Sequence, residues 1–188
     1  MNDENWNRFW KHGDTGVTPT RKNLFKIFAA LDLPRNSVIL DVGCGSGNLA
    51  KFWKDQGYNV TGVDISDESL KLTKNKNVHC IKGDVTKKLP FQDHSFDLVY
   101  SDGLLEHFVD PKPILNEIFR VSNNFVLTLV PRRCLYVNLV NAVFRPPTEY
   151  KKKDNDWIDL HKCFNPVSLE NKIVRYGILL ILCKKNFN

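Results

Sequence analysis

Apolar and polar positions alternate along the chain between two kinds of spacing. Short runs of apolar residues predict buried strands at 37–42, 59–64, 78–84, 96–101, 124–130 and 178–185. Apolar residues three and four positions apart predict helices at 18–31, 48–56, 66–75, 110–121 and 165–176. Strands that alternate with helices form a mostly parallel sheet covered on both faces. We therefore predict a single α/β domain, a three-layer sandwich with a sheet of six or seven strands.

Residues at the ends of the predicted helices support these assignments. Ser66, Asp110 and Asn165 precede helices and are of the types that accept backbone hydrogen bonds at a helix start. Gly57 and Gly177 follow helices, where glycine readily adopts the left-handed conformation that ends a helix.

A glycine-rich stretch, ILDVGCGSGNLA at residues 39–50, joins the first strand to the helix after it. Gly43, Gly45 and Gly47 let the backbone turn sharply and come close to a ligand. The following helix directs its free N–H groups to the same place. Because ligands of parallel sheets bind at the carboxyl ends of the strands, we expect the binding site here.

Three classes of ligand use such turns, and the sequence favours one of them. A phosphate-binding P-loop ends in Gly-Lys-Ser/Thr, whereas Asn48 follows Gly47 here. A dinucleotide fingerprint is GxGxxG, but this spacing is GxGxG, and Asp41 would repel a pyrophosphate. S-adenosylmethionine carries a sulfonium and an ammonium and no phosphate, so an acid is favourable there. An NAD-dependent oxidoreductase is the less favoured alternative.

Two further acids follow the next strands. Asp64 ends the second predicted strand and can accept hydrogen bonds from both hydroxyls of a ribose. Asp84 follows the third strand and can accept from the adenine amino group, while the Val85 N–H donates to a ring nitrogen. Ile65 can pack against the adenine face. A single acid at one of these positions could be an ordinary turn residue. Acids at the ends of three successive strands, together with the glycine turn, form a much more specific pattern for this cofactor.

The segments VILDVGCGSGNLA, VTGVDIS, IKGDV, FDLVYSDGLLEHF and ILNEIFRV carry a resemblance that runs over about residues 37–130. With them the sequence resembles the class I, Rossmann-like S-adenosylmethionine-dependent methyltransferases, and it looks closest to their small-molecule branch. The resemblance implies an enzyme that uses S-adenosylmethionine. The cofactor contacts it implies are Asp41, Gly43, Cys44, Gly45, Asp64, Ile65, Asp84, Val85 and, through its backbone, Ser101.

The sequence departs from that family at two places. The usual Lys-Pro-Gly-Gly turn before the fifth strand is replaced by VSNNF, where Asn123 and Asn124 can still turn the chain. The family normally ends in a hairpin of two strands, whereas only 178–185 has the pattern of a strand here. The sheet is then one strand short, or the sequence is truncated.

Methyl transfer from a sulfonium is an in-line displacement that depends mainly on alignment. A general base is needed only where the acceptor must lose a proton. His107, just past the fourth strand, is the best candidate, because an imidazole titrates near neutral pH. The alternative is a structural histidine bonded to backbone at a helix start. Glu106 and Asp102 lie in the same loop and are weaker candidates for the general base.

The segments outside the central motifs suggest covers for the site. Residues 1–34 form a predicted N-terminal helical cap, in which Trp6, Phe9 and Trp10 share one helix face. In the resembled family such segments often close over the cofactor, where an aromatic ring would attract the sulfonium. Ordinary aromatic packing onto the domain is the competing interpretation.

A long connection at residues 131–165 is the predicted substrate lid. Its apolar residues recur at helical spacing over 135–144, a pattern that also fits a membrane-surface or core helix. Arg132, Arg133 and Arg145 flank this pattern and would suit an acidic acceptor.

Composition narrows the remaining choices. The 188 residues suit one domain, and five scattered cysteines without CxxC spacing predict reduced thiols, no metal site and a cytoplasmic protein. There is no apolar signal-peptide segment and no apolar run of membrane-spanning length. The net charge of +6 leaves an RNA methyltransferase as an alternative. A non-catalytic cofactor-binding subunit is another, and the oligomeric state is not predicted.

Overall fold

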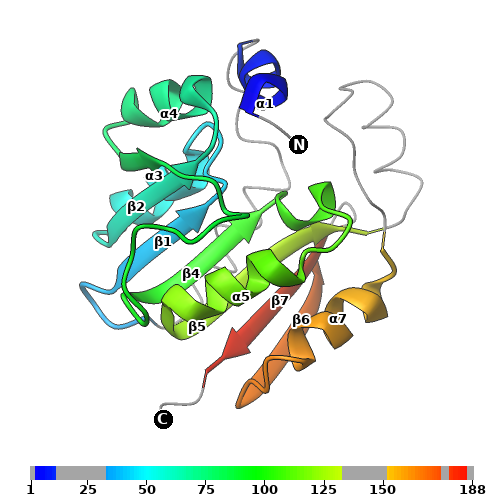
Figure 1. Cartoon of the computed structure of the whole chain (residues 1–188). Helices are drawn as coiled ribbons and strands as arrows, with labels where there is room; N and C mark the ends of the chain where they lie inside the picture. The colour runs from blue at the N-terminus through cyan, green and yellow to red at the C-terminus, as the bar shows by residue number, and fades with distance from the viewer. Residues whose placement is uncertain (1–2, 12–32, 133–151, 175–177, 186–188) are drawn as a thin grey trace.

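A computed structural model describes residues 3–11, 33–132, 152–174 and 178–185, and they form an α/β fold around one sheet (Figure 1). The seven-stranded sheet has the order β3-β2-β1-β4-β5-β7-β6. Its strands are β1 Val38–Val42, β2 Asn59–Asp64, β3 His79–Lys82, β4 Phe96–Asp102, β5 Ser122–Pro131, β6 Ser168–Val174 and β7 Ile178–Lys184. β1 to β5 pair in parallel, whereas β7 is antiparallel to both of its neighbours.

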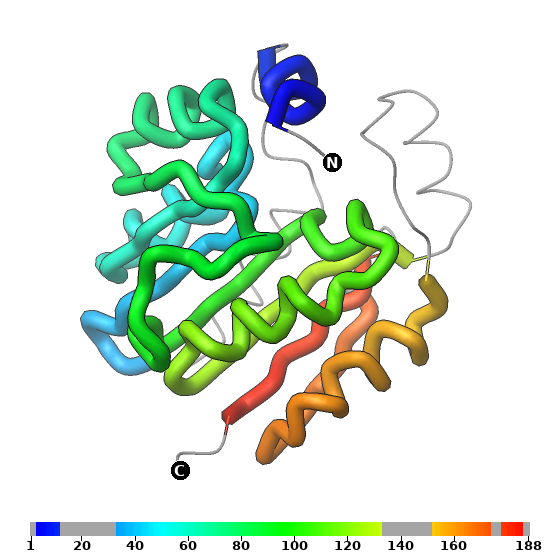
Figure 2. The backbone as a smooth tube through the Cα atoms, in the orientation of Figure 1, coloured from blue at the N-terminus to red at the C-terminus, as the bar shows by residue number. Residues whose placement is uncertain are grey.

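Helices cover both faces of this sheet. They are α1 Asp3–Trp10, α3 Asn48–Asp55, α4 Asp67–Lys74, the short 3-10 helix η1 Leu105–His107, α5 Lys112–Val121 and α7 Asp154–Lys162. α5 and α7 run across the same face, while α1 lies at the end of the molecule beside α4 (Figures 1 and 2). The architecture is the three-layer sandwich that the sequence predicts.

Alternating residues of the central strands supply the two cores. Leu40 and Val42 of β1 point to the face where α5 and Trp157 of α7 pack. Ile39 points to the other face, where it joins a buried cluster with Trp53 of α3. Because each strand is covered on both sides, its residues are apolar in succession.

Most of the predicted elements are confirmed, and their ends lie within two residues of the predicted ones. β2 spans the predicted 59–64, and the Ser66 hydroxyl caps α4 by accepting from the Ser69 backbone N–H at 3.2 Å. Gly57 follows α3 with a φ of 89°. Asp110 accepts from the Lys112 N–H at 3.0 Å, although Pro111 occupies the cap position of α5.

The prediction of a helix at 165–176 is wrong, because residues 168–174 form strand β6. Leu169 and Ile173 lie four positions apart, and this spacing puts two residues on one face of a strand as well as of a helix. Antiparallel pairing with β7 decides between the two. Asn165, the predicted cap, turns the chain with a φ of 46° instead. The C-terminal hairpin is therefore present, and the sheet is not one strand short.

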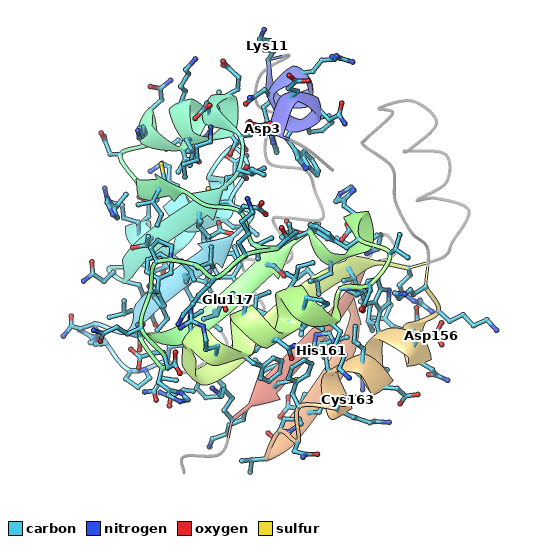
Figure 3. All side chains as sticks on the ribbon, viewed as in Figure 1. Asp3, Lys11, Glu117, Asp156, His161 and Cys163 are labelled. Carbon is cyan, nitrogen blue, oxygen red and sulfur yellow. The ribbon has the colours of Figure 1, made fainter. Side chains whose placement is uncertain are left out.

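Helix α7 was not predicted and lies within the expected insert of residues 131–165. It is part of the core, because Trp157 and His161 are buried against the sheet (Figure 3 labels His161 on α7). The spacing of four residues between Trp157 and His161, together with acidic residues in the first turn, could have predicted this helix from the sequence. The helix expected at 18–31 and the apolar pattern at 135–144 lie outside the described residues. Within the described ranges, no helix is long and apolar enough to cross a membrane.

Candidate active site

The turn after β1 has the conformation that its glycines predict. Gly43, Gly45 and Gly47 have φ angles of 72°, 53° and 73°, in the left-handed region. A Cβ atom on Gly45 would lie 2.6 Å from Cζ2 of Trp10, so glycine is required there by close approach as well as by its dihedral angle. The turn thus brings bare backbone against an aromatic side chain of α1.

Side chains of α4 hold this turn from behind. The hydroxyls of Ser69 and Thr73 both donate to the Gly45 carbonyl at 2.9 Å. The Lys76 ammonium, just beyond the helix, donates to the Ser46 carbonyl at 2.7 Å. These contacts were not predicted from the sequence, because they depend on how α4 packs against the turn.

A cavity of about 250 Å³ opens in front of the turn, at the carboxyl ends of the strands. All of the predicted cofactor residues line it except Ser101, together with the candidate base His107. Ser101 is buried within β4, and the wall is formed instead by its successors Asp102 and Gly103. Ser101 is therefore not part of the described wall.

Asp64 is a buried carboxylate of the cavity that is held by two backbone N–H groups. Its Oδ2 accepts from the Gly45 N–H and its Oδ1 from the Ser66 N–H, both at 2.9 Å. Burial raises the pKa of this carboxyl, although both hydrogen bonds act to lower it. The acid thus ties the end of β2 to the glycine turn, in addition to facing the cavity.

Asp41 is held by a residue that the sequence analysis did not identify. The Tyr100 hydroxyl donates to its Oδ2 at 2.6 Å. The two residues are register partners on adjacent parallel strands, so the contact follows from strand pairing. Burial, and then the charge of Asp41, raise the pKa of Tyr100 well above its ordinary value, so the phenol stays protonated and remains a donor.

Asp84 and Cys44 differ in their ionisation. Asp84 accepts from the backbone N–H and the hydroxyl of Thr86 at 3.0 and 2.6 Å. Burial acts to raise the pKa of this carboxyl, but the Thr86 hydrogen bonds and Lys87 together lower it. Burial and the nearby acids Asp41 and Asp64 raise the pKa of the Cys44 thiol, which is therefore neutral and no nucleophile.

His107 and the aromatic residues of α1 form the other end of the cavity. The imidazole is 7% exposed and packs edge-on against Trp6, with ring centroids 4.8 Å apart. Phe9 stands edge-on to both Trp6 and Trp10, at 5.9 and 5.0 Å. Glu106 is buried beside His107, and the backbone of η1 places both at the cavity. The structure thus brings the predicted cap and the candidate base together.

The predicted acceptor-side arginines are not part of the described wall. Arg132 donates to Asp154 at 2.6 Å and so joins the end of β5 to the start of α7. Arg133 and Arg145 lie outside the described residues.

A seven-stranded sheet of this order, with a glycine turn after β1 and an acid ending β2, is the architecture of the class I methyltransferases. Residues 40–124 match a family model described as "Methyltransferase domain". Residues 40–124 are therefore similar to a methyltransferase domain, and the sheet around them has the Rossmann-like order of class I, whose cofactor is S-adenosylmethionine.

Two curated relatives are similar to this chain in sequence, and a solved structure is similar to it in fold. The chain is 34% identical over 92 residues to a malonyl-[acyl-carrier protein] O-methyltransferase of Hamiltonella defensa, covering 48% of this chain and 35% of that protein. It is 37% identical over 98 residues to a 2-methyl-6-phytyl-1,4-hydroquinone methyltransferase of Synechocystis, covering 47% and 30%. The chain thus spans about a third of the length of these curated relatives. The fold is similar to that of magnesium protoporphyrin IX methyltransferase from Synechocystis with bound SAH, with a TM-score of 0.69 at 16% identity over 97% and 94% of the chains.

Proposed function

We propose that this chain is an S-adenosylmethionine-dependent methyltransferase whose acceptor is a small molecule. The observation that carries the proposal is that acids at the carboxyl ends of three successive strands, Asp41, Asp64 and Asp84, meet at one cavity beside the glycine turn. The names of the two curated relatives support a small acceptor, or one carried on a small protein.

The residues of the cavity fit this cofactor in charge. The three acids at the strand ends line the wall beside the glycine turn, and none of the described wall residues is a lysine or arginine. Asp64 would accept from the ribose hydroxyls and Asp84 from the adenine amino group. Asp41, kept in place by Tyr100, would attract the ammonium end. The same charges would repel a diphosphate.

When bound, S-adenosylmethionine supplies a methyl carbon that its sulfonium has already activated. The work of the chain is then to hold the acceptor in line with it at about 3–3.5 Å. The Trp6 and Trp10 rings of α1 would exclude water and stabilise positive charge through their faces. His107 would take the proton of an acceptor hydroxyl or amine.

An acidic acceptor remains a prediction of the sequence. Among the described wall residues the charged groups are carboxylates, so a cation for such an acceptor would have to come from Arg133 or Arg145. Comparing an aliphatic acid with its neutral amide as acceptor would test this.

The proposal also includes a single domain over residues 1–188 with two covers. Residues of α1 line the cavity, and this supports the predicted N-terminal cap at 1–34. For the substrate lid at 131–165, the candidate portion is 133–151, because α7 packs in the core.

Calorimetric titration followed by a transfer assay tests the function. We expect the protein to bind S-adenosylmethionine and to transfer a tritiated methyl group to a member of pools of organic acids, phenols, quinols and amines. Asp84→Asn should weaken binding about tenfold, because a hydrogen bond to a charged acceptor is lost. Asp159→Asn, on the exposed side of α7, is the matched control and should bind normally.

Each alternative function predicts a different result. Transfer to bulk RNA, with salt-dependent RNA binding, would indicate an RNA methyltransferase instead. Binding without transfer to any pool would indicate a non-catalytic subunit. Binding of NAD with S-adenosylmethionine excluded would overturn the proposal.

A further inference from the structure

The side chain of Asn7 joins helix α1 to the cofactor side of the domain by two hydrogen bonds. The Oδ1 atom of Asn7 accepts from the Ser66 hydroxyl at 2.8 Å and from the Glu68 backbone N–H at 3.2 Å. Ser66 and Glu68 lie at the start of α4, so the amide oxygen links two helices that are distant in sequence. Figure 3 labels Asp3 and Lys11 at the two ends of α1, beside α4.

The contact leads directly to the proposed ribose-binding acid. Ser66 is fully buried, and its backbone N–H donates to Asp64. Its hydroxyl oxygen accepts from the Ser69 N–H, and its single proton goes to Asn7. Asp64 in turn accepts from the Gly45 N–H. A continuous series of hydrogen bonds therefore joins Asn7 to the floor of the cavity.

The same helix places aromatic rings over both ends of that cavity. Trp10 lies against Gly45, and Trp6 lies against His107. α1 has only eight residues, none of them fully buried. A helix of this length is unstable by itself in water, so its position depends on specific contacts such as those of Asn7.

We propose that Asn7 is a positioning residue that clamps α1 over the cavity and thereby slows cofactor entry and release. This inference rests on the proposed function. Asn7 itself does not line the cavity. It acts by holding Trp6 and Trp10 in place, and release of α1 requires both of its hydrogen bonds to break. The exchange rate of the cofactor is then set by a residue outside the binding site.

Stopped-flow fluorescence measures this rate directly. The full-length protein is loaded with S-adenosylhomocysteine and mixed with excess S-adenosylmethionine bearing a fluorescence quencher. Asn7→Ala removes the acceptor atom, and we expect release to become about tenfold faster. Asn7→Asp keeps the acceptor oxygen, and its negative charge is favourable near the N-terminus of α4. It should therefore release S-adenosylhomocysteine within about threefold of the wild-type rate.

Arg8→Ala is the matched control, since Arg8 is an exposed neighbour on the same helix. It should leave the release rate unchanged. Hydrogen exchange adds a second readout: in Asn7→Ala the amides of 4–11 should exchange faster while those of β1 and β4 keep their protection.

The outcomes separate the clamp from the function. If the wild type binds S-adenosylhomocysteine and Asn7→Ala releases it at the wild-type rate, the clamp is overturned while the proposed function stands. If Asn7→Asp releases S-adenosylhomocysteine as fast as Asn7→Ala does, the accepting oxygen does not slow release, and the clamp is again overturned. If the wild type binds neither nucleoside, the proposed function fails and the clamp with it.

Discussion

At the scale of single residues, buried side chains that line the cavity also hold the surrounding backbone in place. Asp64 accepts two backbone hydrogen bonds that shape the glycine turn, and it also faces the cavity. Tyr100 holds Asp41 from within the sheet. Substituting either acid would therefore change the turn or the strand as well as the ligand contacts, so loss of binding in such variants is ambiguous. His107 makes a cleaner test.

We expect His107→Gln to lower turnover about 100-fold if the imidazole takes the acceptor's proton. The Kd for S-adenosylmethionine, measured by calorimetry, should stay within about twofold, because in the proposed mechanism the imidazole acts on the acceptor. His79→Gln replaces an exposed histidine outside the cavity wall and serves as the matched control, which should turn over normally. Unchanged turnover in His107→Gln would remove the catalytic role.

At the scale of elements, α7 is docked by a histidine that must be neutral. The Trp157 carbonyl can only accept, so His161 Nδ1 carries the proton and donates to it at 2.7 Å. His161 Nε2 then accepts from the Thr128 hydroxyl of β5 at 2.9 Å. Burial lowers the pKa of this histidine to about 4. Protonation would remove an acceptor and place a charge in the core.

Stability should therefore fall as the pH drops. The unfolded chain binds the proton with an ordinary pKa of about 6.5, so it takes up protons before the folded state does. We expect the titration of His161 to lower the free energy of unfolding by about 2 kcal/mol between pH 7 and pH 5. Above about pH 6.5 this stability is regained. In His161→Gln, the free energy of unfolding measured by urea denaturation should fall by about 2 kcal/mol less than in the wild type over the same pH range. The exposed His79→Gln controls for loss of an imidazole, and an equal drop in His161→Gln would refute the assignment.

At the scale of the whole molecule, the C-terminal hairpin completes the sheet that carries the site. β7 lies between β5 and β6, and its Ile181 and Cys183 are fully buried. Burial raises the pKa of the Cys183 thiol to about 12, as expected for a core position. The strands that end at the cavity are thus held by a sheet that extends well beyond it.

A chain shortened to end at residue 165 should lose cooperative folding. It would expose the buried face and edge of β5, and the lost packing exceeds the marginal stability of a domain, about 5–15 kcal/mol. Near-UV circular dichroism and a denaturation curve would report the loss. A chain that ends at Lys185 keeps the bond from its N–H to the Asn124 carbonyl and should fold normally. A cooperative transition in the shorter chain would contradict this view of the hairpin.

The sequence alone determined the strand–helix alternation from the first to the fifth strand, the glycine turn, and the acids at the ends of the first three strands. These follow from local chemistry, because apolar runs, positive φ and cap residues act within a few positions of the chain. Only the tertiary structure decided that 168–174 is a strand, since a spacing of four residues fits either element and pairing with β7 resolves it. It also decided the contacts of Tyr100 with Asp41 and of Asn7 with Ser66. Each joins positions 59 apart in the chain, and no local pattern encodes such a distance.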